Sequence, residues 1–283
     1  MRMRSHAITD RFATCKTANF PIESGGIWPA PCGTVKGMDN GGAVTDRLIA
    51  QAQIPQGARA LDVGCGNGMV TFRLAAAVGA QGRVLGIDPN EKALAAACQK
   101  ASADSVANVA FAAHDLFAFA RSGQRFDVVM CRRVLMYLPD QIAAAKAFKA
   151  LLKPDGCLIV QEHDASMAHS TAPLPLAQQA SSWIWDTVKA EGANPATGFD
   201  LPSILRAAGF TAVSITAEAI VETPGQRAAT AQIVRIMLSR IEAAGVATAQ
   251  EIDIETLEDR LDAERHLTAA TSVSEMIFGA VAR

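Results

Sequence analysis

The stretch LDVGCGNGM, from Leu61 to Met69, sets three glycines between an apolar run and a helix-favouring segment. The run ARALDVG predicts a buried strand, and the ten residues from Met69 to Val78 predict a helix. Between the two, glycine allows backbone conformations that other residues avoid and lets a ligand approach closely. A strand, a glycine-rich turn and a helix form the arrangement that binds a nucleotide at the carboxyl end of a parallel strand.

The alternation of strand and helix continues beyond this turn. Four further apolar runs predict strands: RVLGID, NVAFAAHD, FDVVMC and GCLIVQEHD. Helical patterns separate them: one covers residues 91–101, a short one ends at residue 117, and a third covers residues 139–152. Nearly continuous apolar strands are typical of a parallel sheet covered by helices on both faces. The order therefore predicts a doubly wound α/β fold.

After the fifth strand the pattern changes. Helical patterns at 177–190 and 202–208 precede the strand TAVSITAEAI, and a mainly helical segment separates it from a last strand, SVSEMIFGAVAR. The sheet would then have seven strands. The helical insertion, about 222–270, predicts a lid over a pocket, although its apolar stripe also fits ordinary core packing. Residues 1–45, rich in glycine and proline, predict an N-terminal arm or cap to a domain at 46–283.

Charge and apolar content exclude several classes of partner. Lys and Arg number 26 against 28 Asp and Glu, a net charge of −2. This leaves no basic excess to neutralise phosphates, so no nucleic-acid partner is expected. No apolar run reaches transmembrane length, and no signal-peptide core follows the basic start. We therefore expect a cytoplasmic protein with no membrane partner. No Cys-x-x-Cys pair occurs, so no metal site is expected.

The spacing of the glycines narrows the ligand. The dinucleotide pattern G-x-G-x-x-G needs a last glycine where Met69 stands, and the P-loop pattern is absent. Asp88 follows Gly68 by 20 residues, at the end of the second strand, where a carboxylate can accept hydrogen bonds from ribose hydroxyls. Together with Asp62 inside the loop motif, it indicates a cofactor with a ribose and a cationic amino-acid end.

The motifs LDVGCGNG, GIDP, AAHDL and LLKPDGCLIV resemble, in order and spacing, those of class I S-adenosylmethionine (SAM)-dependent methyltransferases. The resemblance covers roughly Ala58 to Glu162. It implies a Rossmann-like fold whose last strand is antiparallel, and SAM as the cofactor.

The resemblance also implies which residues hold SAM. The loop would hold the methionine end, Asp88 the ribose and Asp115 the adenine amino group, while the end of the fourth strand would lie beside the sulfonium. Helix capping or a turn is the alternative role for Asp88 and Asp115. The implied cofactor-binding residues are Asp62, Gly64, Cys65, Gly66, Gly68, Asp88, Pro89, Asp115, Leu116, Cys131 and Arg132.

The residues that would face the methyl acceptor are predicted to lie at the carboxyl ends of the fourth and fifth strands. The catalytic candidates are His163, Arg133 and Tyr137, with Glu162, Asp164 and His169 nearby. A histidine can take a proton at neutral pH, although a structural, hydrogen-bonded His163 is equally consistent with the sequence. Packing is the favoured role of Tyr137. Arg132 and Arg133 cannot both point inward if the backbone there is extended.

The overall layout is similar to the small-molecule branch of the superfamily, which includes ubiquinone/menaquinone-type C-methyltransferases and natural-product methyltransferases. It implies transfer of the SAM methyl group to O, N or C of a small, cyclic or aromatic metabolite. Two alternative functions fit a nucleotide-binding fold. One is a non-catalytic SAM- or nucleotide-binding regulatory protein, and the other is a nicotinamide-dependent oxidoreductase, which Met69 disfavours. A homodimer is left open.

Overall fold

One sheet of eight strands organises the described part of the chain. The computed structural model describes residues 40–224 and 229–283, so all but the last six residues of the predicted arm lie outside it. The strands run in the order β3-β2-β1-β4-β5-β8-β6, and β7 also pairs with β8. They are β1 (Arg59–Val63), β2 (Arg83–Ile87), β3 (Val109–Ala112), β4 (Phe126–Arg132), β5 (Leu152–Asp164), β6 (His169–Ser170), β7 (Val213–Glu222) and β8 (Ser272–Ala282).

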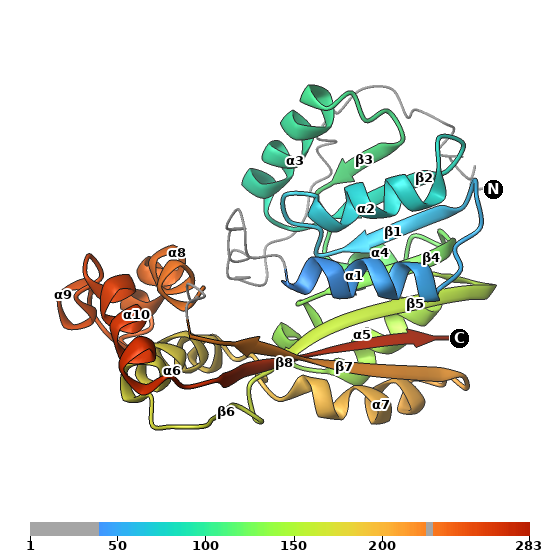
Figure 1. Ribbon diagram of the computed structural model, residues 1–283. Helices are drawn as coiled ribbons and strands as arrows, with labels where there is room; N and C mark the ends of the chain where they lie inside the picture. Colours follow the sequence, from blue (N-terminus) through green and yellow to red (C-terminus); the bar gives the residue numbers. More distant parts are fainter. Residues whose placement is uncertain (1–39, 225–228) are drawn as a thin grey trace, which may run out of the picture.

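The pairing confirms the doubly wound arrangement. Strands β1 to β5 are all parallel, whereas β8 runs antiparallel to β5 and β7. From β1 the chain proceeds outward to β2 and β3, then returns to place β4 on the other side of β1. The carboxyl ends of β1, β4 and β5 therefore meet at one edge of the sheet, at the left in Figure 1. This change of direction beside β1 is where ligands of such folds bind.

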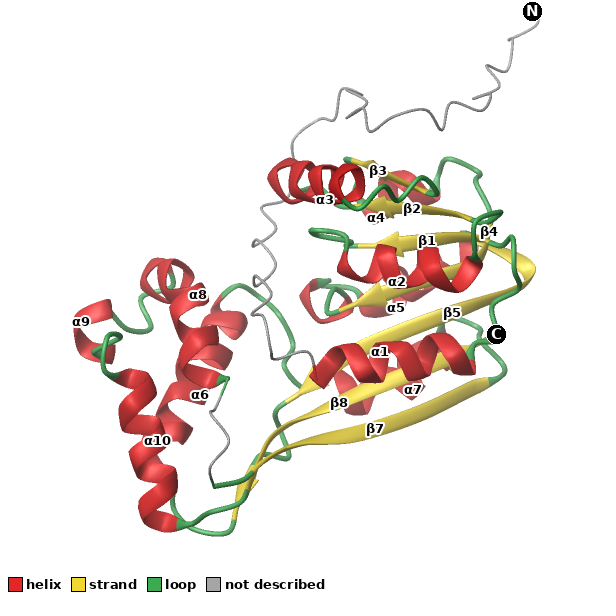
Figure 2. Cartoon of the chain, turned by 45° about the horizontal axis from the view of Figure 1, so that its top comes forward, coloured by secondary structure: helices red, strands yellow, loops and turns green. Residues whose placement is uncertain are grey.

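Helices cover both faces of the sheet, as Figure 2 shows. Apolar residues of α1 and α2 pack on one face and those of α4, α5 and α7 on the other, while α3 lies over β3. The central strands β1, β4 and β5 are apolar towards both layers, because helices cover both of their faces. These helices are α1 (Asn40–Gln51), α2 (Met69–Val78), α3 (Glu91–Ala103), α4 (Leu116–Ala120), α5 (Gln141–Ala150) and α7 (Thr197–Ala207).

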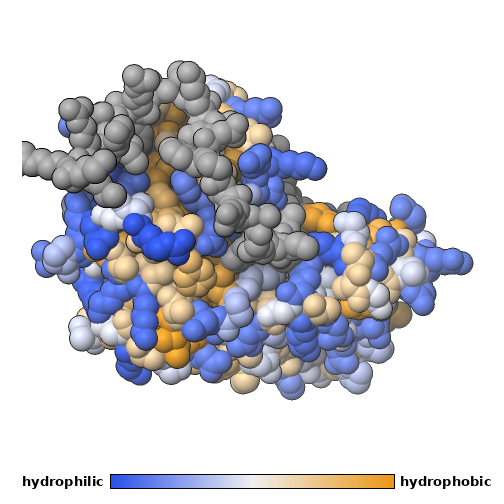
Figure 3. Space-filling model, turned by 180° about the vertical axis from the view of Figure 1, so that it is seen from behind, coloured by the Kyte–Doolittle hydropathy of each residue, from blue (hydrophilic) through white to orange (hydrophobic). Residues whose placement is uncertain are grey.

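Hydrophilic and apolar residues interleave over the face seen in Figure 3. Large apolar side chains that are exposed include Phe199, Met167 and Leu267. Within 40–224 and 229–283, no helix combines the length and the hydrophobicity that crossing a bilayer requires.

The remaining helices form a separate lobe beyond the carboxyl edge of the sheet (Figure 1). They are α6 (Pro175–Ala190), α8 (Thr230–Ala243), α9 (Ala249–Ile252) and α10 (Leu257–Thr268). The lobe has its own core, which includes Trp183, Val234, Met237 and Leu261. Helices α8 to α10 lie between β7 and β8 in the chain, where the sequence predicts a helical insertion. The apolar stripe of α8 packs into this core.

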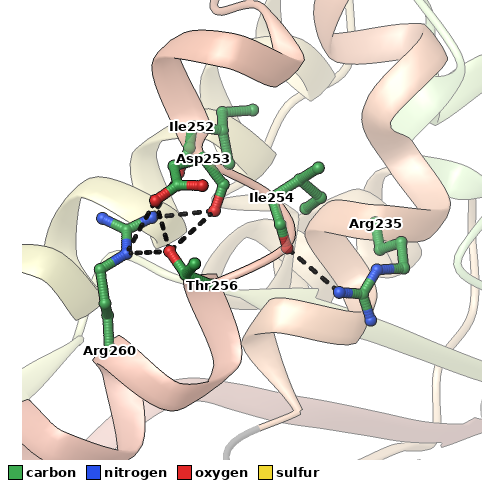
Figure 4. A network of polar contacts seen from close by, with 6 residues as sticks. All are labelled: Arg235, Ile252, Asp253, Ile254, Thr256 and Arg260. Carbon is green, nitrogen blue, oxygen red and sulfur yellow. Dashed lines mark hydrogen bonds and ion pairs between the residues drawn. The ribbon is translucent and has the colours of Figure 1, made fainter.

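Two arginines satisfy the carbonyl groups of the turn between α9 and α10 (Figure 4). Arg260 donates to the carbonyl oxygens of Ile252 and Asp253, at 2.5 and 3.1 Å. Arg235, from α8, donates to the carbonyl oxygen of Ile254 at 3.1 Å. Carbonyls at the end of a helix have no partner within it. The arginines supply those partners and tie α8 and α10 to the same turn.

Two expectations need correction. The sheet has eight strands rather than seven, because β6 pairs with the start of β8 through His169 and Ser170. A strand of two residues is too short to show a periodic pattern in the sequence. Helix α7 begins at Thr197 rather than Pro202, since its first turn is held by Asp164, whose Oδ2 accepts from the Phe199 N–H at 3.3 Å.

A matched pair of substitutions in α10 tests the core of the helical lobe. Leu261 is 2% exposed and Leu267 is 87% exposed. We expect Leu261→Ala to lower the free energy of unfolding by about 2–5 kcal/mol, because it leaves a cavity. Leu267→Ala should change it by less than about 0.5 kcal/mol. Urea unfolding followed by circular dichroism measures both, and equal effects would contradict the packing of α10.

Candidate functional site

The glycine loop lies tightly between β1 and α2. Gly64, Gly66 and Gly68 have φ angles of +69°, +53° and +84°, which other residues rarely adopt. A Cβ added at Gly64 would lie 2.2 Å from Cγ2 of Val134, and one at Gly68 would lie 3.0 Å from Cζ of Phe111. Space and backbone conformation thus both require glycine there. Gly68 has no side chain to cap the amino end of α2, and the Thr71 N–H in its first turn is bonded to Asp62.

Asp88 joins this loop to the end of the neighbouring strand. Its Oδ2 accepts from the Gly66 N–H at 2.9 Å, and its Oδ1 accepts from the Asn90 N–H at 2.8 Å. Asp88 is 5% exposed, and burial raises the pKa of its carboxyl group, partly offset by these two hydrogen bonds. Because each carboxylate oxygen can accept more than one hydrogen bond, capacity remains for further donors.

Asp62 lies on β1, one residue before Val63, and is fully buried. Its Oδ2 accepts from the Thr71 hydroxyl of α2 at 2.6 Å. Burial raises the pKa of Asp62 to about 7, although the Thr71 hydrogen bond lowers it in part, and the charge of Asp88 raises it further. The loop is therefore flanked by two buried acids, at the ends of β1 and β2.

Asp115 caps a helix, the alternative role that its position allowed. Its Oδ1 accepts from the N–H groups of Phe117 and Ala118, at 2.9 and 3.0 Å, at the start of α4. Leu116 buries its side chain in the sheet core, whereas Pro89 is exposed. Cys65 and Cys131 are buried, and burial raises the pKa of both thiols, which makes them poor nucleophiles.

The extended backbone of β4 ends between its two arginines. Arg132 ends the strand and is half-buried, while Arg133 has a φ of +57° and an exposed side chain. The Arg133 N–H donates to the Gln161 carbonyl at 2.9 Å. The charge of Arg132 lowers the pKa of Asp62 and of His163. Its field thus reaches both the glycine loop and the end of β5.

Tyr137 connects this edge to the helical lobe. It lies on a short 3-10 turn, η1 (Leu135–Tyr137), and packs against the lobe core. Its hydroxyl accepts from Nη2 of Arg240 at 3.5 Å, and Arg240 also pairs with Glu191 at 2.5 Å. These contacts fit the packing role that the sequence favours.

The turn after β4 is held by Glu162 of β5. Its Oε1 accepts from the N–H groups of Val134 and Leu135, at 3.1 and 2.8 Å. Its Oε2 is buried and has no hydrogen-bond partner among the described residues. Burial raises the pKa of Glu162 to about 7, partly offset by the two N–H groups.

His163 is buried at the end of β5, next along the strand from Glu162. Its Nδ1 lies 2.9 Å from Oε1 of Glu275 on β8, although the ring N–H is not aimed straight at this oxygen. Its Nε2 is buried without a hydrogen-bond partner in the described chain. Burial lowers the pKa of His163, and Glu275 raises it in part. The two other candidates nearby have different environments. Asp164 accepts hydrogen bonds from the N–H and the hydroxyl of Ser166 at the start of the next loop, and His169 is exposed.

Glu275 is absent from the predicted site. The signal for it lies in the strand SVSEMIFGAVA, where a single acid interrupts a mainly apolar run. A buried acid needs a partner, but the sequence does not say which residue pairs with it across the sheet.

Fold and site together define an α/β protein of the nucleoside-cofactor-binding class, with a glycine loop after β1 and an acid after β2. The sequence model of the methyltransferase domain family matches residues 54–209. The chain belongs to this family, and its resemblance to class I SAM-dependent methyltransferases is confirmed.

Curated relatives match the chain in part. It is 30% identical over 132 residues to a ubiquinone biosynthesis O-methyltransferase of Coxiella burnetii, which covers 46% of this chain and 54% of the relative. It is 34% identical over 116 residues to a demethylmenaquinone methyltransferase of Staphylococcus aureus, covering 41% and 47%. The chain thus spans about half the length of these relatives.

A solved structure shares the fold at low identity. The phosphoethanolamine N-methyltransferase 2 of Haemonchus contortus, solved with S-adenosylhomocysteine (SAH), superposes with a TM-score of 0.53 at 18% identity. The match covers 85% of this chain and 52% of that one.

The buried acids make stability depend on pH. The pKa of Glu162 rises from 4.5 to about 7 on folding, so the folded state holds a proton that the unfolded state releases. The contribution of protonated Glu162 to the free energy of unfolding is complete below about pH 4.5. It is lost as the pH rises through about 7, a change of about 3 kcal/mol. Asp62 acts in the same direction.

We therefore expect wild-type protein to lose more unfolding free energy between pH 5 and pH 8 than Glu162→Gln. Urea unfolding at both pH values measures the difference. The control is Glu218→Gln, which removes a surface carboxylate paired with Arg47. Parallel losses in wild type and Glu162→Gln would show that Glu162 does not titrate as described.

Proposed function

We propose that the protein transfers the methyl group of SAM to O, N or C of a small, cyclic or aromatic metabolite. The observation that carries the proposal is the glycine loop bound to Asp88 at the carboxyl edge of the sheet. Membership of the methyltransferase domain family supports it. The relatives named for ubiquinone and menaquinone biosynthesis support the acceptor class.

The residues at this edge fit the parts of SAM. A cradle that admits no side chain at Gly64 and Gly68 suits the methionine end, with Asp62 as a nearby acid. Asp88 has accepting capacity for ribose hydroxyls, and Pro89 lies next to it on the exposed side. The rest of the proposed set comprises Cys65 and Gly66 in the loop, Asp115 and Leu116 at the adenine, and Cys131 and Arg132 near the sulfonium.

The Asp115 cap is compatible with its proposed contact to adenine. The cap occupies Oδ1, and a carboxylate has a second oxygen that can accept from an amino group. Leu116 would then contribute its backbone, since its side chain is buried in the core.

Bound SAM supplies an activated methyl group, so the protein has to align a nucleophile, exclude water and receive a proton. His163 is the proposed base, because its Nε2 is free to accept a proton and burial keeps the ring neutral by lowering its pKa. Arg133 is proposed to meet the acceptor from the exposed side, and Tyr137 to close the site towards the helical lobe.

The larger organisation is part of the same proposal. Residues 46–283 would form the methyltransferase domain, with 1–45 as an arm and the insertion at about 222–270 as a lid. The lobe containing α8 to α10 lies beyond the carboxyl edge of the sheet, which suits a lid (Figure 1). A cytoplasmic location and the absence of a nucleic-acid or membrane partner stay predictions, and a homodimer is left open.

Calorimetry with SAH, followed by transfer of labelled methyl from SAM to a panel of phenols, quinols and amines, tests the function. We expect binding and methylation of at least one ring-containing acceptor. Absence of SAH binding would overturn the proposal. Binding without transfer to any acceptor would favour the non-catalytic alternative, and NAD(H) outcompeting SAH would favour an oxidoreductase.

Substitution of Asp88 tests the cofactor site. We expect Asp88→Ala to weaken SAH binding by about 1–3 kcal/mol, roughly 5- to 150-fold, because ribose hydroxyls lose their acceptor. Asp88→Asn keeps an oxygen for the Gly66 N–H and separates the ribose contact from loop distortion. Asp104→Ala, at an exposed acid paired with Lys100, is the control. Unchanged affinity in both Asp88 variants would place SAM elsewhere.

Substitution of His163 tests the base. We expect His163→Ala to lower kcat by about a hundredfold or more and to change SAH affinity by less than about twofold. His169→Ala, at an exposed histidine on β6, should leave both values unchanged. If His163→Ala retains the wild-type kcat, then His163 is structural.

A further inference from the structure

Two polar pairs, each made of one buried and one half-buried side chain, lie where β5, β7 and β8 approach the helical lobe. Nδ1 of His163 lies 2.9 Å from Oε1 of Glu275, with side-chain exposures of 6% and 18%. Nη2 of Arg265, from α10, lies 2.9 Å from Oε2 of Glu222, with exposures of 2% and 15%. Burying charged groups costs free energy even when they are paired. Such pairs at the edge of a site are candidates for a functional role.

The register of the sheet explains why Glu275 reaches the histidine. His163 pairs directly with Ile277 of β8, and Glu275 comes two residues before Ile277. Side chains two residues apart on a strand share a face, so Glu275 is the diagonal neighbour of the imidazole ring. The carboxylate lies at Nδ1, which leaves Nε2 as the ring nitrogen without a partner among the described residues.

We propose that Glu275 is the positioning residue for His163: it holds the proton on Nδ1 and so presents an unprotonated Nε2 to the methyl acceptor. The inference rests on the proposed methyl transfer, for acceptors whose nucleophile carries a proton. The acceptor's O–H or N–H proton passes to Nε2 while the acceptor atom bonds to the methyl carbon. The carbon–sulfur bond breaks and SAH is released. The carboxylate of Glu275 then stabilises the imidazolium ion.

The imperfect alignment of the pair is consistent with this role. The ring N–H does not point straight at Oε1, although the heavy atoms are at hydrogen-bond distance. Catalytic hydrogen bonds are often poorly aligned without substrate and tighten when it binds. A small rotation of the imidazole ring would complete the bond.

The surrounding charges are arranged so that Glu275 stays ionised. Burial by itself would raise the pKa of Glu275, but the adjacent imidazole of His163 and the charge of Arg133 together lower it. Its neighbour Glu222 is held by Arg265, and the charge of Glu275 raises the pKa of Glu222.

The other charged groups near the ring come from several elements. In the described chain, Arg132 at the end of β4 and Arg133 after it act on His163, and Glu275 interacts with Glu222 of β7, which is paired with Arg265 of α10. The charged residues of α1 are engaged in surface pairs, Asp46 with Arg73 and Arg47 with Glu218.

The first test reads the histidine directly and needs no activity. Nitrogen NMR of the imidazole, with and without SAH, reports the tautomer and the pKa of His163. We expect the Nδ1–H tautomer in wild type, and a pKa lower by about one unit in Glu275→Gln, because the imidazolium loses its counter-charge. In Glu275→Asp, the pKa of His163 should return most of the way to its wild-type value. Glu218→Gln is the matched control and should change neither reading.

The second test follows turnover of a methylated acceptor. In Glu275→Gln, kcat should fall by about ten- to a hundredfold with KM changed by less than about twofold. The acid limb of the kcat/KM profile should move to lower pH together with the NMR pKa.

The two readings separate the inference from the proposed function. An unchanged tautomer and pKa in Glu275→Gln would overturn the inference, as would a shifted pKa that the pH profile does not follow. If no acceptor is methylated at all, the proposed function fails, and the NMR titration still decides whether Glu275 positions His163.

Discussion

The hydrogen bond from the Gly66 N–H to Asp88 fixes the turn after β1 against the end of β2, and the rest of the site depends on it. The turn leaves no room for side chains, because a Cβ at Gly64 would overlap Val134 and one at Gly68 would crowd Phe111. Helix α2 begins directly after this turn, at Met69, so its amino end lies at the carboxyl edge of the sheet. Parallel pairing then brings the ends of β4 and β5 to the same edge.

Buried acids at this edge are stabilised by different partners. Asp62 accepts from a hydroxyl, Asp88 and Glu162 accept from backbone N–H groups, and Glu275 is paired with His163. Burial favours the neutral form of a carboxyl group, whereas each of these partners favours the charged form. The balance leaves Asp62 and Glu162 with pKa values of about 7, so the edge can change its charge near neutral pH.

The helical lobe is joined to the sheet through polar contacts as well as through its chain connections. Tyr137 meets Arg240 of α8, and Arg265 of α10 meets Glu222 of β7. The second contact lies near Glu275, the partner of the buried His163. The proposed cofactor site therefore comes from one continuous part of the chain, while the proposed acceptor site combines β4, β5, β8 and the lobe.

The sequence alone determined the order of strands and helices, the glycine loop and the acid after β2, because these depend on local periodicity and on glycine spacing. Tertiary structure decided what local pattern cannot show. It added the two-residue β6, started α7 before Pro202, assigned Asp115 a cap and paired Glu275 with His163. The pairing of β5 with β8 joins residues more than a hundred positions apart. Register across a sheet is set by long-range packing, so no single stretch of sequence contains it.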